Sequence, residues 1–244
     1  MNARVVHLSI VIPAFNEAGR IRQAVEELRA YLPSVSPDFE IRVVDDGSVD
    51  ETAAIVEEIA RTDCRVVLQR EAHGGKGSAV RAGLMAATGD LRLICDADLS
   101  MPVQEIRRFL DIVPAECDIA IGTREGAGSR RVGEPVFRHL LGRAFNAIVR
   151  VLVLPGLNDT QCGFKLFTSK AVDTVFPMTT IAGWAFDVEV LYIARLQGLR
   201  AAEVPIEWHY KSDSKISPLR HSVQMALDIG KIRVNGLRKR YERS

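Results

Sequence analysis

The sequence LRLICDAD, at Leu91–Asp98, joins a short apolar run to a pair of carboxylates. The run Leu91–Cys95 predicts a buried strand, so Asp96 and Asp98 lie at its carboxyl end. Side chains two residues apart on a strand share a face, and the two carboxylates therefore converge on one point. Carboxylates this close repel each other unless a hard cation or a proton lies between them. Taken alone, the same spacing is also found in solvated turns and helix caps.

Short apolar runs on both sides of this stretch alternate with helical patterns. We expect strands at Leu8–Ile12, Glu40–Val44, Arg65–Gln69, Leu91–Cys95 and Cys117–Ile121. Between them we expect helices at Ile21–Leu32, from near Asp50 to Ala60, and from the glycine-rich turn at His73–Ser78 to Thr88. This alternation predicts an α/β fold with a mainly parallel, Rossmann-like sheet and helices on both faces.

Composition sets limits on the class of protein. The 244 residues, 47% of them apolar, are enough for one large domain with a sizeable core. The 32 basic and 31 acidic residues balance, which argues against a nucleic-acid partner. The spacing of Cys64, Cys95, Cys117 and Cys162 predicts free thiols in a reducing compartment. No apolar run reaches the ~20 residues that span a bilayer, so we expect a soluble protein or one on a membrane surface.

The pattern becomes less regular after Gly122, where arginines gather. An apolar stripe at helical spacing runs from Phe137 to Leu152, with polar residues opposite. Two alternatives stay open for it: a core-facing helix, or a helix resting on a bilayer. The stretch Met225–Tyr241 is ambiguous in the same way, and its basic end either contacts anionic lipid or is simply solvated. A further helix is expected through Val190 and Ile193.

Polar groups follow three of the predicted strands, in Pro13–Glu17, Asp45–Ser48 and Asp96–Asp98. Parallel strands end at the same edge of a sheet, where ligands bind, so these segments are expected to share a cleft. For Asp50 we favour a helix cap instead. The glycine-rich turn matches neither a P-loop nor a dinucleotide fingerprint. It is either a plain tight turn or a place where backbone and Lys76 approach a diphosphate.

Seven motifs together carry a family resemblance. They are VIPAFNE (Val11–Glu17), VVDDGS (Val43–Ser48), GGKGSAVRAG (Gly74–Gly83), DADLS (Asp96–Ser100), DTQCGFKLF (Asp159–Phe167), WAFDVE (Trp184–Glu189) and VPIEWH (Val204–His209). The combination resembles glycosyltransferase family 2, and within it the dolichyl-phosphate β-glucosyltransferases and their prokaryotic polyprenyl-phosphate relatives. The resemblance implies a GT-A fold, a nucleotide-sugar donor, Mg²⁺ or Mn²⁺, a polyprenyl-phosphate acceptor and inversion at the anomeric carbon.

The resemblance also implies roles for individual residues. At the donor it places Pro13, Phe15, Glu17, Asp45, Asp46, Lys76, Gly77, Asp96 and Ala97. Asp98 is expected to be the main metal ligand, with Asp96 as the second. Facing the acceptor it places Arg124, Arg131, Gln161, Lys165 and Lys215, and at the reacting centre Asp98, Arg124, Asp159 and Asp187. For the cations the alternative is a solvated surface position, and for Asp187 it is a helix cap.

The implied organisation is one GT-A domain over residues 1–244, with a nucleotide-sugar half (1–122), an acceptor half (123–218) and an amphipathic helical tail (219–244). The implied reaction transfers a hexose, glucose from UDP-glucose, to a polyprenyl phosphate at the cytoplasmic face of a membrane. Leu99 and Ser100 are more typical of dolichyl-phosphate mannosyltransferases, and Gly183 stands where the glucosyl relatives carry arginine. A mannosyltransferase using GDP-mannose, a family 2 enzyme with a non-lipid acceptor, and a non-catalytic nucleotide-sugar-binding subunit therefore remain alternatives. The sequence leaves the oligomeric state open.

Overall fold

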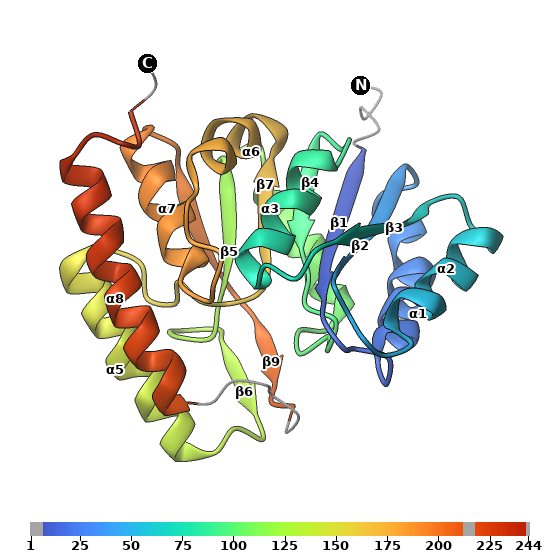
Figure 1. Ribbon diagram of the computed structural model, residues 1–244, viewed down its shortest axis with the longest axis horizontal. Helices are drawn as coiled ribbons and strands as arrows, with labels where there is room; N and C mark the ends of the chain where they lie inside the picture. Colours follow the sequence, from blue (N-terminus) through green and yellow to red (C-terminus); the bar gives the residue numbers. More distant parts are fainter. Residues whose placement is uncertain (1–6, 212–217, 243–244) are drawn as a thin grey trace.

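The computed structural model describes residues 7–211 and 218–242. Its centre is a seven-stranded sheet with the order β3-β2-β1-β4-β7-β5-β8 (Figure 1). The strands of this sheet are β1 (Leu8–Ala14), β2 (Phe39–Asp46), β3 (Val66–Glu71), β4 (Leu91–Ile94), β5 (Ile119–Thr123), β7 (Lys165–Thr168) and β8 (Ala201–Pro205). A separate two-stranded ladder joins β6 (Arg130–Val132) to β9 (Glu207–His209).

The helices are α1 (Ile21–Tyr31), α2 (Thr52–Thr62), α3 (Lys76–Ala86), α4 (Ile106–Ile112), α5 (Val136–Leu152), α6 (Ser169–Val175), α7 (Phe186–Leu196) and α8 (Pro218–Leu237). Short 3₁₀ turns lie at Leu32–Ser34, Val103–Glu105 and Phe176–Met178. All five predicted strands form, with ends displaced by one or two residues. The second helix begins at Thr52, and Asp50 accepts a hydrogen bond from the Thr52 N–H (3.0 Å), as expected for a residue at a helix start.

The predicted mainly parallel α/β sheet is confirmed. Strands β3, β2, β1 and β4 run parallel to one another, as do β5 and β8. The sequence did not predict β7, which lies antiparallel between β4 and β5. The second half is also more regular than predicted. Besides the expected helices it contains four strands, β6, β7, β8 and β9, and the helix α6.

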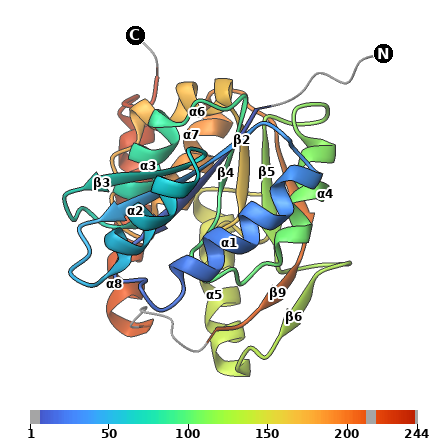
Figure 2. The same cartoon turned by 90° about the vertical axis from the view of Figure 1, so that its right-hand side faces the viewer.

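Helices cover both faces of the sheet, as Figure 2 shows from the side. Alternate residues of one strand enter different cores: Ile10 and Ile12 of β1 pack with α1, α2 and α4, whereas Val11 packs with α3 on the opposite face. This two-sided burial explains why the strands are continuous apolar runs rather than alternating patterns. The second core also contains α7, which is buried from Phe186 to Ala194, and part of α8.

Helices α5 and α8 lie at the end of the molecule away from α1 and α2 (Figure 1). Both leave apolar side chains exposed. On α5 the exposed set is Val136, Phe137, Leu140, Ile148, Val151 and Leu152, and on α8 it is Leu227, Val234 and Leu237. The exposed fraction is 71% for Phe137 and 75% for Leu237. Val149 is buried, so α5 contacts the core there, whereas Phe137, Leu140, Ile148 and Leu152 of the same stripe are exposed. In the described ranges, no helix combines the length and the apolar character needed to cross a bilayer.

Candidate active site

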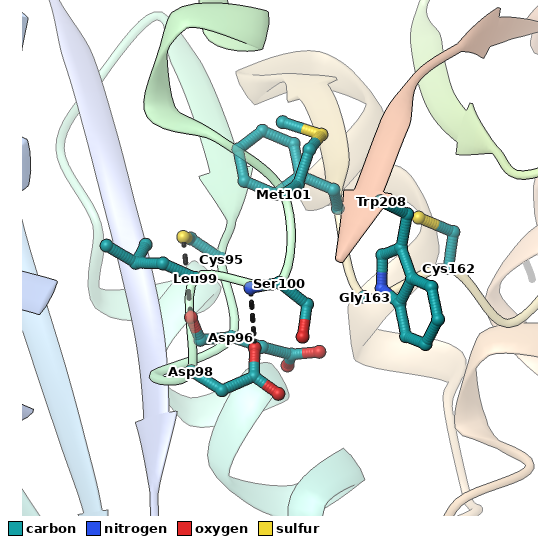
Figure 3. A pocket seen from close by; sticks show the side chains of 10 residues that line it. Cys95, Asp96, Asp98, Leu99, Ser100, Met101, Cys162, Gly163 and Trp208 are labelled. Atoms are coloured by element: carbon teal, nitrogen blue, oxygen red, sulfur yellow. Dashed lines mark hydrogen bonds between the residues drawn. The ribbon is translucent and has the colours of Figure 1, made fainter. Parts of the chain in front are cut away.

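The carboxyl ends of β2, β1 and β4 meet at one edge of the sheet, because these strands are parallel neighbours. Beyond β4 the chain turns through Leu99, which has a positive φ of 46°, and the turn directs Asp96 and Asp98 into a cleft. The two carboxylates therefore converge through a turn rather than through strand pleating, since β4 ends at Ile94. Figure 3 shows them on one side of the cleft and the indole of Trp208 on the other.

Asp98 places its carboxylate on the wall of the cleft. The Ser100 N–H donates to its Oδ1 (2.9 Å). Burial, together with the charge of Asp96, raises the pKa of Asp98. A cation at this point would therefore stabilise the ionised form of Asp98. The described ranges hold no cluster of three or more ligating side chains. One or two carboxylates suit Mg²⁺ or Mn²⁺, because such ions take their remaining oxygens from substrate phosphates and water.

Asp96 is held by groups from two other parts of the chain. Its Oδ1 lies 2.6 Å from Nζ of Lys76 at the start of α3, and this ammonium lies 5.3 Å from the ring centre of Trp184. Burial acts to lower the pKa of Lys76, but the charges of Asp96, Asp187 and Asp98 together outweigh it, and the pKa is raised. On the other side, a Cβ at Gly163 would lie only 1.9 Å from Asp96 Oδ2, so any larger residue there would displace the Asp96 carboxylate.

Strand β7 brings a second buried ion pair to the same edge. The fully buried Lys165 places its Nζ 2.5 Å from Oδ1 of Asp187 and 2.5 Å from the carbonyl of Cys162. Burial raises the pKa of Asp187, and Lys165 opposes this. Asp187 lies in the first turn of α7, but its carboxylate bonds to Lys165 and does not cap the helix.

Arg124, which directly follows β5, forms a bidentate salt bridge with the fully buried Asp159. Nε and Nη2 of Arg124 donate to the carboxylate at 2.7 and 2.8 Å, and the Arg124 N–H adds a third bond at 3.0 Å. Burial acts to raise the pKa of Asp159, but Arg124 outweighs it and lowers the pKa to about 2. The guanidinium also lies 5.3 Å from the ring centre of Trp208, which joins it to the wall of the cleft.

Arg131 is half-buried between two glutamates. It donates to Glu134 (2.5 Å), to Glu125 (2.8 Å) and to the carbonyl of Arg124 (3.1 Å). His139 of α5 lies 3.5 Å from Glu134 and 3.8 Å from Glu125. Arg131, Glu134 and His139 border a second cavity, together with Val136 and Leu140 from the exposed start of α5.

Three amides of the glycine-rich turn are bonded to other parts of the protein. The N–H groups of Gly74 and Gly75 donate to Asp46 at 2.8 and 2.9 Å, and the Gly77 N–H donates to the carbonyl of Ala182 at 2.8 Å. These amides are therefore already bonded within the protein. Lys76 nevertheless reaches the cleft through its side chain.

The other predicted donor residues lie at the same edge. Asp45 is buried and accepts from the Ser48 N–H (3.2 Å), while the ring of Phe15 stacks on His73 with centres 4.3 Å apart. Glu17 pairs with Arg20, Pro13 is half-buried in β1, and Ala97 is buried between the two carboxylates. Gln161 is half-buried beside Asp159, and Lys215 lies outside the described residues. The functional role of each of these residues stays a prediction.

Three residues at the cleft were not singled out from the sequence: Gly163, Trp184 and Trp208. Each lies inside a quoted motif, DTQCGFKLF, WAFDVE or VPIEWH. Gly163 has no chemistry of its own, and its importance comes only from the Asp96 carboxylate beside it. The two tryptophans are the only ones in the chain, and this rarity could have identified them as candidate site residues from the sequence.

A mainly parallel sheet with a D-x-D turn at its ligand-binding edge defines a glycosyltransferase of the GT-A class. The sequence model of glycosyl transferase family 2 matches residues 9–176. The chain therefore belongs to glycosyltransferase family 2, as the motifs predicted.

Similar proteins support this membership over the full length. A dolichyl-phosphate β-glucosyltransferase of Trichomonas vaginalis is 36% identical over 242 residues, covering 94% of this chain and 71% of its own. That of Homo sapiens is 33% identical over 245 residues, covering 94% and 76%. Among solved structures, mannosyl-3-phosphoglycerate synthase from Rubrobacter xylanophilus superposes with a TM-score of 0.69 at 20% identity, covering 96% of this chain and 74% of its own. Glucosyl-3-phosphoglycerate synthase from Mycobacterium tuberculosis, with Mn²⁺, UDP and glucosyl-3-phosphoglycerate, gives 0.65 at 18% identity, covering 94% and 79%. At these identities the likeness to the solved structures concerns the fold.

Proposed function

We propose that the protein transfers glucose from UDP-glucose to a polyprenyl phosphate in one in-line displacement, giving a β-linked product. The observation that carries the proposal is the cleft itself. The carboxylate of Asp98 lines this cleft and faces a wall whose residues come from the segments that hold Arg124 and Lys165. Relatives that cover nearly the whole chain are dolichyl-phosphate β-glucosyltransferases. Residues 1–122 would bind the donor and residues 123–218 the acceptor, with 219–244 as a helical tail.

On the donor side, Asp45 and the Pro13–Glu17 segment would hold the nucleoside, and Asp96 with Lys76 the sugar diphosphate. When bound at Asp98, Mg²⁺ or Mn²⁺ would neutralise the charge that develops on the departing nucleoside diphosphate. Lys76 reinforces this neutralisation from the protein side, because its ammonium lies 2.6 Å from Asp96 in the same cleft. Its raised pKa keeps it cationic at neutral pH.

On the acceptor side, a phosphate oxygen is already anionic and attacks the anomeric carbon without a strong base. It needs cations that position it. Asp159 fixes the plane of the Arg124 guanidinium, which leaves its remaining N–H groups available for a phosphate. An acceptor phosphate at Arg131 would take the place of a glutamate, since Arg131 is bonded to both Glu125 and Glu134.

A hydroxyl acceptor fits the site less well. A hydroxyl nucleophile requires a general base, and Asp187 is the candidate at the reacting centre. Its Oδ1 is bonded to Lys165 at 2.5 Å, and burial encloses the pair. The pairing with an ammonium weakens Asp187 as a proton acceptor, which favours an acceptor that needs none.

The lipid acceptor requires access to a membrane, and α5 and α8 offer it. Their exposed apolar side chains would enter the head-group region of a bilayer, with flanking arginines and lysines against anionic lipids. The protein would then work as a peripheral enzyme on the cytoplasmic face, with the opening beside Arg131 and Val136 directed at the membrane.

The test is hexose transfer by the purified protein to a detergent-solubilised polyprenyl phosphate, with Mn²⁺ and a set of UDP- and GDP-sugars. Asp98→Ala should abolish metal-dependent transfer and keep the wild-type melting temperature. The matched control is Asp111→Ala, which removes an exposed carboxylate that pairs with Arg107 on the surface. Wild-type turnover in Asp98→Ala would refute the site, and transfer from GDP-mannose alone would replace glucose by mannose.

A further inference from the structure

A buried carboxylate outside the cleft, Glu189, connects segments that are far apart in the sequence. It lies in the first turn of α7 and is fully buried. Its Oε2 accepts from the N–H groups of Thr180 and Ile181, both at 2.8 Å. Its Oε1 accepts from the hydroxyls of Thr180 and Tyr241, both at 2.7 Å. A buried carboxylate is strongly unfavourable without such donors, so Glu189 fixes where these groups lie.

The segment held by Glu189 caps the helix that carries Lys76. The carbonyl of Ala182 accepts from the N–H groups of Gly77 (2.8 Å) and Ser78 (3.3 Å). Both N–H groups lie in the first turn of α3, where an amide has no partner inside its own helix. No side chain caps α3, so the Ala182 carbonyl takes the place of a capping side chain.

The close approach of the two segments explains two glycines of the turn. A Cβ at Gly75 would lie 2.9 Å from the carbonyl oxygen of Ala182, and one at Gly77 would lie 2.7 Å from that of Ile181. Lys76 stands between these glycines. Any shift of the 180–182 segment is therefore transmitted to the backbone on both sides of Lys76.

The other end of the network is the end of the chain. Tyr241 follows α8 and is only 1% exposed, although the residues around it are exposed. Asn235 donates to its hydroxyl (3.2 Å), and Gln197 donates to its carbonyl (2.6 Å). The hydroxyl of Tyr241 in turn donates to Glu189, so the C-terminal turn is anchored to the core at a defined point.

We propose that Glu189 and Tyr241 are positioning residues for donor binding. They hold the 180–182 segment, this segment holds the start of α3, and α3 places the Lys76 ammonium beside Asp96. Neither residue lines the cleft. The inference rests on the proposed donor role of Lys76 and assigns control of donor affinity to the far end of the chain.

The test is Tyr241→Phe, with Tyr192→Phe as the matched control. Tyr192 packs against Tyr241 with ring centres 6.1 Å apart, but no hydrogen bond of its hydroxyl is found within the described residues. Hydrogen exchange of the Gly77 and Ile181 amides measures how often the hydrogen bonds of the 180–182 segment open. Calorimetry with UDP and Mn²⁺ measures donor affinity. We expect exchange at both amides and the Kd for UDP to rise about tenfold in Tyr241→Phe, with an unchanged KM for the lipid phosphate. Glu189→Gln should act in the same direction, and Tyr192→Phe should leave exchange and Kd as in the wild type.

Three results would overturn the inference. The first is unchanged exchange at Gly77 in Tyr241→Phe. The second is faster exchange that is equal at core amides such as that of Ile10, since this means a general loss of stability. The third is a local increase at Gly77 with an unchanged Kd for UDP. Failure of the proposed function is a separate observation, because it appears as absent hexose transfer by the wild-type protein while the exchange measurement remains valid.

Discussion

Replacing Gly163 by alanine should inactivate the protein without unfolding it. The new Cβ would lie 1.9 Å from Oδ2 and 2.6 Å from Cγ of Asp96. To reach even 3.0 Å the carboxylate oxygen must retreat by about 1.1 Å, and this moves it relative to Lys76 and Asp98. A displacement of about 1 Å at a reacting centre costs roughly a hundredfold in rate, or about 2.7 kcal/mol of transition-state stabilisation. The side chain that moves is partly exposed, so the free energy of unfolding should change little.

The assay is kcat/KM for transfer to the lipid phosphate, measured with the melting temperature of the same preparation. Gly19→Ala is the control, because a Cβ at Gly19 has nothing within 4 Å and its φ is not positive. The control should retain wild-type activity. If Gly163→Ala kept kcat/KM within about threefold of the wild type, the position of Asp96 would not matter for the reaction, and the argument would be refuted.

Two further predictions concern acid stability and membrane binding. The pKa of Asp159 is about 2 in the folded protein and about 3.9 in an unfolded chain, so its ion pair stabilises the fold above about pH 4 and loses this effect as the pH falls toward 2. Urea titrations of wild type and Asp159→Asn should therefore differ by about 2 kcal/mol in their pH dependence over this interval, and parallel pH profiles would contradict the assignment. Phe137→Ser combined with Leu237→Ser should lower co-sedimentation with anionic vesicles at least about tenfold, because burial of each side chain is worth roughly 1.5–3 kcal/mol. Since both side chains are largely exposed, the melting temperature should stay the same. Undiminished vesicle binding would show that α5 and α8 do not bind the membrane through these side chains.

The first half of the fold was predictable because its strands are continuous apolar runs closed by acidic turns. The edge that carries Asp45, Asp96 and Asp98 followed from parallel pairing alone. Strand β7 escaped prediction because four residues beginning with a lysine give no periodic signal, and its position between β4 and β5 depends on tertiary packing. Its Lys165 is buried only because Asp187 comes from α7 to meet it.

The candidate site was predictable as a set of residues but not as a set of contacts. The sequence identified the glycine-rich turn, and it could not show that Gly77 is required by the 180–182 segment about a hundred positions later. Tyr241 gave no signal at all, since a tyrosine in a basic C-terminal stretch usually stays solvated. Its burial depends on a carboxylate at position 189 that needs a fourth donor.

The antiparallel insertion of β7 bears on how the chain is made. During synthesis β4 is complete at Ile94, yet the strand that covers its open edge begins only at Lys165. At ribosomal speed this interval lasts on the order of ten seconds, during which a row of unpaired amides and carbonyls is accessible to other chains. A fragment ending near Gly122 would keep this edge unpaired, so the proposed donor half is expected to aggregate when it is expressed alone. The β7 segment that closes the sheet is preceded directly by Cys162, Gly163 and Phe164, which line the cleft. A nascent chain therefore completes its sheet and its cleft in the same event.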